Sequence, residues 1–77
     1  MKVIMLTRKH CNQCEMMKQV LKDRVEYADV LDRPDLIGLT RYTSLPVFLV
    51  FNEELCIGSF YGLMSLERFE EKMRMYA

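Results

Sequence analysis

Short apolar runs alternate along this chain with segments whose apolar residues recur at helical spacing. Lys2–Thr7 is an apolar run with a β-branched pair, which is typical of a buried strand. Residues 12–22 contain no Gly or Pro and are rich in helix-forming residues, so they predict a helix. The expected apolar stripe of that helix consists of Met16, Met17, Val20 and Leu21. We therefore expect a strand and a helix joined by the polar residues 8–10.

The middle of the chain predicts three more strands and a second helix. Val25–Leu31 predicts a strand, although its apolar and polar residues alternate imperfectly. Asp32 is placed to cap a short helix over Pro34–Tyr42, because proline is favoured in a first helical turn. The β-branched and aromatic residues of Val47–Phe51 predict a central strand, and Leu55–Phe60 predicts an edge strand paired with it.

The last segment predicts a third helix. Ser65 is its natural N-cap, and Gly58 and Gly62 bracket the bend that leads into it. The expected apolar face of this helix consists of Leu66, Phe69, Met73 and Tyr76. The resulting order, β-α-β-α-β-β-α, predicts one α/β domain over residues 1–77. Its first two strands should be parallel and its last two a hairpin, in a four-stranded mixed sheet with helices on both faces.

Composition narrows the class of protein. The 77 residues are 51% hydrophobic, which is enough to form a core. The charges of 11 basic and 11 acidic residues cancel, so the formal net charge is zero. The chain therefore has no overall field for nucleic acid or an anionic membrane. The longest apolar run, residues 47–51, is far shorter than the roughly 20 residues that span a bilayer. We expect a monomeric cytoplasmic protein with neither a nucleic-acid nor a membrane partner.

Two of the three cysteines, Cys11 and Cys14, form a C-x-x-C where the first strand gives way to the first helix. A thiol at a helix N-terminus faces unpaired N–H groups and the positive end of the helix dipole. Such thiols have pKa values lowered from about 8.5 to between about 3.5 and 7.5, and His10 adds to that field. We expect Cys11 to be an exposed nucleophile and Cys14, one turn further in, to be the resolving thiol.

Metal sites are the main alternative for a C-x-x-C. A zinc site would have to recruit Cys56 and His10, but His10 directly precedes Cys11 and is poorly placed to complete a tetrahedron. A c-type haem needs His after the second cysteine, where Glu15 stands. An all-protein iron–sulfur cluster needs four thiolates, and the chain has three. We expect no metal, and we expect Cys56 to be a buried strand residue without a role.

Taken together, these features resemble the glutaredoxins of the thioredoxin superfamily over essentially the whole chain. The shared features are the C-x-x-C that opens the first helix, Ser44-Leu45-Pro46 before the third strand, and the Gly-containing bend before the last helix. The resemblance implies a thioredoxin fold and a cis peptide bond before Pro46, which positions substrate. It also implies that the backbone of Leu45 pairs with substrate, and that a redox-active Cys11–Cys14 disulfide is the only redox group.

Glutathione recognition is less well matched. Asn12-Gln13 replaces the usual Pro-Tyr between the cysteines, and the acidic pair at the start of the last helix is missing. The resemblance still places Arg8, His10 and Arg41 as candidate contacts. The backbone around Leu45, Met64 and Ser65 completes the candidate substrate and glutathione site, since helix-start amides bind anions.

Other features resemble the NrdH-type redoxins, which thioredoxin reductase reduces and which donate electrons to ribonucleotide reductase. These features are Gln13 before the second cysteine and the passage at 58–64, although Met17 stands where Thr is usual and the Trp of that branch is absent. A thioredoxin proper is disfavoured because W-C-G-P-C is missing. The expected function is reduction of protein or glutathione mixed disulfides, with glutathione or thioredoxin reductase as reductant. The alternative is a glutathione-dependent iron–sulfur cluster carrier, against which the second cysteine counts.

Overall fold

The computed structural model describes residues 1–76, which contain four strands and three α-helices in the predicted order. Within this part of the chain, no helix is long and apolar enough to cross a membrane. In chain order the elements are β1 (Lys2–Thr7), α1 (Asn12–Leu21), a 3₁₀ turn (Lys22–Arg24), β2 (Glu26–Asp29), α2 (Pro34–Ile37), β3 (Val47–Asn52), β4 (Leu55–Tyr61) and α3 (Leu66–Arg74).

The strands form one mixed sheet in the order β2-β1-β3-β4. β1 runs parallel to β2, with Met5 opposite Tyr27, and antiparallel to β3, with Met5 opposite Phe48. β4 pairs antiparallel with β3, and Asn52 lies opposite Leu55 across a two-residue turn. β3 is thus a central strand and β4 an edge strand, as predicted.

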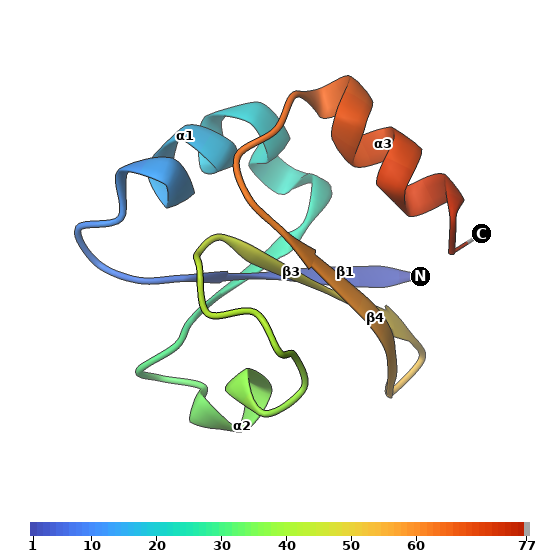
Figure 1. Ribbon diagram of the computed structural model, residues 1–77, viewed down its shortest axis with the longest axis horizontal. Helices are drawn as coiled ribbons and strands as arrows, with labels where there is room; N and C mark the ends of the chain where they lie inside the picture. Colours follow the sequence, from blue (N-terminus) through green and yellow to red (C-terminus); the bar gives the residue numbers. More distant parts are fainter. Residues whose placement is uncertain (77) are drawn as a thin grey trace.

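Helices cover both faces of this sheet, which confirms the predicted α/β architecture. α1 and α3 lie on one face and α2 lies on the other (Figure 1). The core under α1 and α3 is built mainly from Met5, Met17, Phe48, Phe60 and Phe69. The core under α2 is built from Ile4, Leu6, Leu36, Val47, Leu49 and Phe51. Because both faces are buried, β1 and β3 are almost continuously apolar instead of alternating with polar residues.

The second helix is shorter than the predicted Pro34–Tyr42, and Asp32 is not its cap. α2 spans only Pro34–Ile37, and its N-cap is Arg33, which makes no side-chain capping bond. The backbone N–H of Asp32 instead donates to the Asp29 carbonyl in a turn that follows β2. These turn bonds hold Asp32 outside the helix, and the short helix ends at Gly38.

The second strand is also shorter than the predicted Val25–Leu31. It ends at Asp29, whose Oδ1 accepts a hydrogen bond of 2.8 Å from the N–H of Leu31. This local bond competes with ladder pairing and turns the chain away from the sheet. Leu31 is consequently 70% exposed instead of lying within a strand.

Two details of the predicted helix faces and bends are wrong. Met16 is 52% exposed, because the buried positions of α1 are Cys14, Met17 and Leu21. Gly58 lies inside β4 and not at a bend, and Gly62, with φ +107°, is the bend residue. The cap of the last helix is confirmed, since Ser65 Oγ accepts a hydrogen bond of 3.1 Å from the N–H of Arg68.

Candidate active site

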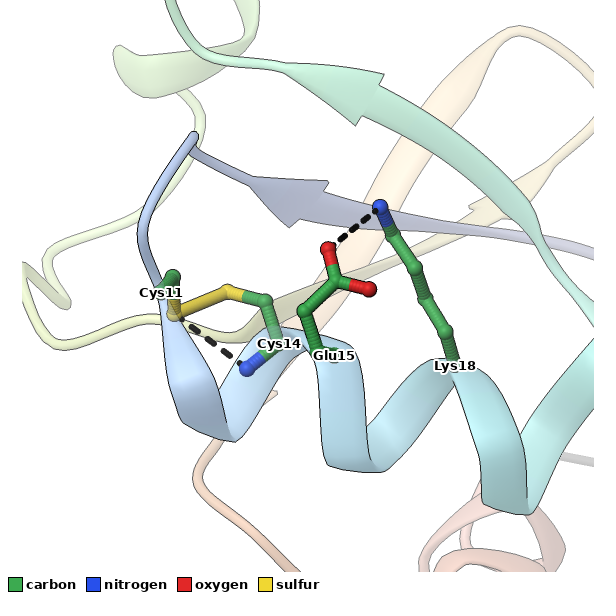
Figure 2. Close-up of a disulfide and its surroundings, with 4 residues drawn as sticks. All are labelled: Cys11, Cys14, Glu15 and Lys18. Atoms are coloured by element: carbon green, nitrogen blue, oxygen red, sulfur yellow. Dashed lines mark hydrogen bonds and ion pairs between the residues drawn. A yellow bond between two sulfur atoms is a disulfide. The ribbon is translucent and has the colours of Figure 1, made fainter.

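Cys11 is the N-cap residue of α1, a position usually held by Ser, Thr, Asp or Asn. Its extended backbone lets the carbonyl accept the first helical bond, from the N–H of Glu15 at 3.1 Å. Its Sγ accepts a hydrogen bond of 3.2 Å from the N–H of Cys14 (Figure 2). The sulfur of Cys11 therefore replaces a capping oxygen and lies at the positive end of the helix dipole.

Cys11 and Cys14 are joined by a disulfide, with Cα atoms 5.2 Å apart (Figure 2). This separation lies inside the range that a disulfide normally spans. The two sulfurs differ in access, because Cys14 is fully buried in the core under α1 whereas Cys11 is half-buried. Cys11 is therefore the more accessible of the two sulfurs, and the roles predicted for them stay a prediction.

A hollow of about 510 Å³ opens beside Cys11, and we call it the Cys11 hollow. Its remaining wall consists of Arg8, Lys9, His10, Leu31 and Leu45. These residues come from three separate segments that meet at one edge of the sheet. Because β1 and β2 are parallel, the loops after Thr7 and Asp29 leave the sheet at the same edge.

The Cys11 hollow is positively charged. Within residues 1–76, neither Arg8 nor Lys9 forms an ion pair, and no acidic side chain lines the hollow. Arg33 differs from these two cations, because it pairs with Asp35 at 3.0 Å. That hydrogen-bonded pair lowers the pKa of the exposed Asp35 carboxyl and raises the pKa of Arg33. The unpaired cations beside Cys11 thus remain available to an anion.

Pro46 and Leu45 lie where the resemblance places them. The Leu45–Pro46 peptide bond is cis, as implied by the resemblance. Leu45 packs, as Cys11 does, against the core under α1, and it also lines the Cys11 hollow. The Pro46 carbonyl accepts a hydrogen bond of 2.9 Å from the N–H of Gly62, which ties the loop before α3 to the start of β3. The role of these two residues toward a substrate stays a prediction.

The amides expected to bind glutathione at the start of α3 are partly occupied. The N–H of Met64 donates to the thioether sulfur of Met17, at 3.3 Å. The hydroxyl of Ser65 is used in capping α3. The half-buried Met64 packs on the same core as Cys11, so the loop that holds both residues lies on the dithiol side of the sheet.

Arg41 is not brought to the Cys11 hollow. It lines a separate hollow of about 620 Å³ together with Tyr42 and Ser59. There the Tyr42 ring packs on the Tyr61 ring, with centroids 4.6 Å apart, so this segment lies over β4. Of these three candidate contacts, Arg8 and His10 meet at Cys11 and Arg41 does not.

Two residues of the site were not among the predicted contacts. Lys9 was expected only as part of the polar connection at residues 8–10, and Leu31 was assigned to a strand. A sequence signal for Leu31 exists, since it is an apolar residue directly after the second of two parallel strands. Ligands bind at the carboxyl ends of such strands.

Cys56 lies at the other end of the sheet. It pairs with Phe51, which lies opposite Lys2 at the start of β1, whereas Cys11 follows the end of β1. Its thiol is half-buried, not fully buried as predicted, against the core under α2. In the described residues, no three His, Cys, Asp or Glu side chains are grouped as a metal site would need.

Comparison with known proteins identifies the fold. No protein-family model matches the sequence, and no curated protein matches it. A mutant thioredoxin from Halobacterium salinarum is 16% identical, with a TM-score of 0.78 over 96% of this chain and 72% of that one. The germline-specific thioredoxin Deadhead of Drosophila melanogaster is 19% identical, with a TM-score of 0.78 over 97% and 79% of the two chains. Thioredoxin 1 from Thermosipho africanus is 18% identical, with a TM-score of 0.67 over 99% and 93%.

These similarities show that the chain has the thioredoxin fold, as predicted. All three structures are thioredoxins, so they do not distinguish the glutaredoxins from the NrdH-type redoxins. The closer resemblance to either branch stays a prediction.

Proposed function

We propose that this protein is a thiol–disulfide oxidoreductase in which Cys11 attacks and Cys14 resolves. One observation supports this assignment above the others. The half-buried Sγ of Cys11 caps α1 and bonds to the fully buried Sγ of Cys14, so the pair combines an accessible sulfur with a protected one. A buried thiol in apolar surroundings is inert by comparison with one at a helix N-terminus.

The reaction begins with both cysteines reduced. The Cys11 thiolate attacks one sulfur of the substrate disulfide, and the bond between the substrate sulfurs breaks. The electron pair of that bond leaves on the departing thiolate, which takes a proton from water. Cys14 then loses its proton and attacks the Cys11 sulfur, which releases the second substrate thiol. The substrate gains two electrons, and the protein ends with the Cys11–Cys14 disulfide.

Two reductants can return the protein to its dithiol form, and the closer family resemblance decides between them. A glutaredoxin takes two electrons from two molecules of glutathione, whereas an NrdH-type redoxin takes them from thioredoxin reductase. On the NrdH-type resemblance, ribonucleotide reductase is the proposed protein substrate in the cytoplasm, and the protein acts as a monomer.

Equilibration with glutathione redox buffers, followed by acid trapping and intact mass measurement, distinguishes reduction by glutathione from reduction by thioredoxin reductase. Reduction at roughly −200 to −230 mV identifies a glutaredoxin. A disulfide that opens only with thioredoxin reductase identifies a redoxin.

Single-cysteine variants test the assignment itself. We expect Cys11→Ser to abolish disulfide reduction, and Cys14→Ser to accumulate a mixed disulfide with substrate at Cys11. Cys56→Ser is the matched control and should keep full activity, since Cys56 lies at the opposite end of the sheet. Undiminished activity of Cys11→Ser would exclude this mechanism.

The alternative function, glutathione-dependent cluster carriage, has its own test. The buried Cys14 lies close enough to Cys11 to bond with it and competes with a metal for that sulfur. We therefore expect anaerobic reconstitution with iron, sulfide and glutathione to leave the protein colourless. A stable brown protein would favour the carrier.

A further inference from the structure

An apolar pocket of about 200 Å³ lies on the face of the sheet that carries α2, and we call it the α2-face pocket. Its floor includes Leu6 and Val47, which are opposite each other in the β1–β3 ladder at the sheet edge nearest the dithiol. Ile37 and Tyr42, which are 46% and 41% exposed, leave it accessible from outside. Arg8 is the only charged side chain among the residues that line it within the described chain.

This pocket adjoins the Cys11 hollow. Arg8 and Leu45 line both of them, so these two residues form the boundary between the hollow and the pocket. Leu45 is the residue before the cis-proline and belongs to both core clusters, which places it at the end of the sheet between its two faces. A substrate held at Cys11 can therefore extend into the α2-face pocket.

The size and chemistry of the pocket point to one kind of occupant. An apolar cavity of about 150 Å³ holds a benzene molecule, so about 200 Å³ is sufficient for a Phe or Leu side chain. Glutathione has no apolar side chain to place there. The pocket thus favours a polypeptide over glutathione as the carrier of the disulfide.

Charge adds a second element of recognition. Arg8 and Lys9 have no acidic partner in residues 1–76, and both line the Cys11 hollow. An acidic group on the substrate would pair with Arg8 at the boundary between the hollow and the pocket. A partly exposed pair of this kind contributes mainly to orientation and association rate.

We infer that the α2-face pocket selects polypeptide disulfides, taking a Phe or Leu side chain that lies near the reactive cysteine while Arg8 pairs with an acidic residue beside it. This inference rests on the proposed function. It adds Ile37 and Tyr42 as specificity-determining residues, on the opposite face of the sheet from the dithiol helix, and it gives the side chain of Leu45 a part in selection at the boundary between the two faces.

Seven-residue peptides with a central cysteine test the inference. The cysteine is activated as its mixed disulfide with thionitrobenzoate, and Phe, Leu or Ala is placed in turn at each of the four neighbouring positions. Pre-reduced protein in a Cys56→Ser background is mixed with each peptide in a single turnover. Attack by Cys11 on the peptide sulfur breaks its bond to thionitrobenzoate, which leaves as a coloured thiolate. Cys14 then releases the peptide thiol. N-acetylcysteine carrying the same group is the probe without neighbouring residues.

We expect one position at which Phe or Leu reacts at least tenfold faster than Ala, as burial of a large apolar side chain provides. Thr43→Phe fills the pocket from an exposed lining position and should erase that preference, while its rate with the N-acetylcysteine probe stays within twofold. Ile37→Ala, which removes part of the exposed wall, should weaken the preference about threefold. In peptides that also carry Glu or Gln next to that position, the Glu peptide should react faster, and Arg8→Gln should remove this difference.

The outcomes separate this inference from the proposed function. Equal rates for Phe, Leu and Ala peptides at every position overturn the pocket assignment and leave the oxidoreductase intact. Retention of the preference in both Thr43→Phe and Ile37→Ala overturns it as well. Failure of the reduced protein to release thionitrobenzoate even from N-acetylcysteine overturns the proposed function, and the inference with it.

Discussion

The backbone N–H of Met64 donates a hydrogen bond to the thioether sulfur of Met17, at 3.3 Å, across 47 residues of sequence. Met17 lies one turn after Cys14 on α1 and is fully buried, whereas Met64 belongs to the loop before α3. The bond therefore joins the dithiol helix to the loop that packs beside it. A thioether is a weak acceptor. The bond of the Met64 amide therefore depends on the buried position of the Met17 side chain.

Met17→Leu tests how much that sulfur contributes to stability and to protection of the Met64 amide. The substitution nearly conserves volume, which keeps the packing cost small, but it removes the acceptor of the Met64 amide. We expect a loss of about 1 kcal/mol in the free energy of unfolding by urea, together with faster hydrogen exchange at Met64. Met16→Leu is the matched control, because Met16 is exposed on the same helix, and it should change neither. Unchanged exchange at Met64 in Met17→Leu would contradict the prediction.

The reduced protein should show a pH dependence that originates at Cys11. Helix-start amides favour its thiolate, so we expect the pKa of Cys11 in the folded protein to lie below the value of about 8.5 in the unfolded chain. A lowered folded-state pKa contributes stability that is present above pH 8.5 and lost as the pH falls through the folded pKa. The rate of alkylation of Cys11 by iodoacetamide should accordingly have its pH midpoint below the value of about 8.5 for a free thiol.

The control for that titration is the Cys11→Ser variant, in which Cys14 remains. Because Cys14 is fully buried, its alkylation at pH 7 should be at least tenfold slower than that of Cys11 in Cys14→Ser. Comparable rates would mean that burial does not distinguish the two thiols.

Lys22 ends α1 in a backbone conformation that favours glycine, with φ +51° and ψ −117°. Lys22→Gly should relieve this strain of roughly 1–3 kcal/mol, at an entropic cost of about 0.5–1 kcal/mol. We expect a net gain of about 1 kcal/mol in the free energy of unfolding by urea. Gln19→Gly, on an exposed position inside the same helix, should lose about 1 kcal/mol instead. Destabilisation by both substitutions would show that the conformation of Lys22 is not strained.

Gly58 gives β4 room for the ring of Tyr76. A Cβ atom at this position would lie 2.7 Å from the Tyr76 hydroxyl and even closer to the ring. Gly58→Ala should displace that ring from the core, with a loss of about 1 kcal/mol in the free energy of unfolding. In a Tyr76→Ala background the same substitution should cost little, and a double-mutant cycle measures the difference. If Gly58→Ala lowered the free energy of unfolding equally in the two backgrounds, contact with the Tyr76 ring would not be the cause of the loss.

The sequence by itself determined the element order and the position of the dithiol, because both depend on local pattern. The short apolar runs of β1 and β3, with their β-branched residues, are typical of buried strands, and the helix after Cys11 begins where its helix-forming residues begin. The length of β2 was wrong for a local reason as well. The Asp29 side chain and the turn bonds to its carbonyl divert the chain, and side chains of this type compete with regular structure without changing the apolar pattern.

Only the tertiary structure decided which residues surround Cys11. Arg8 and Arg41 were equal candidates in the sequence, but Arg8 follows β1 and lies beside Cys11, while Arg41 lies over β4. Leu31 and Leu45 join Cys11 because parallel pairing of β1 and β2 and the central place of β3 bring three distant loops to one edge of the sheet. Such meetings depend on strand pairing between segments far apart in sequence, which no local pattern of hydrophobic and polar residues encodes.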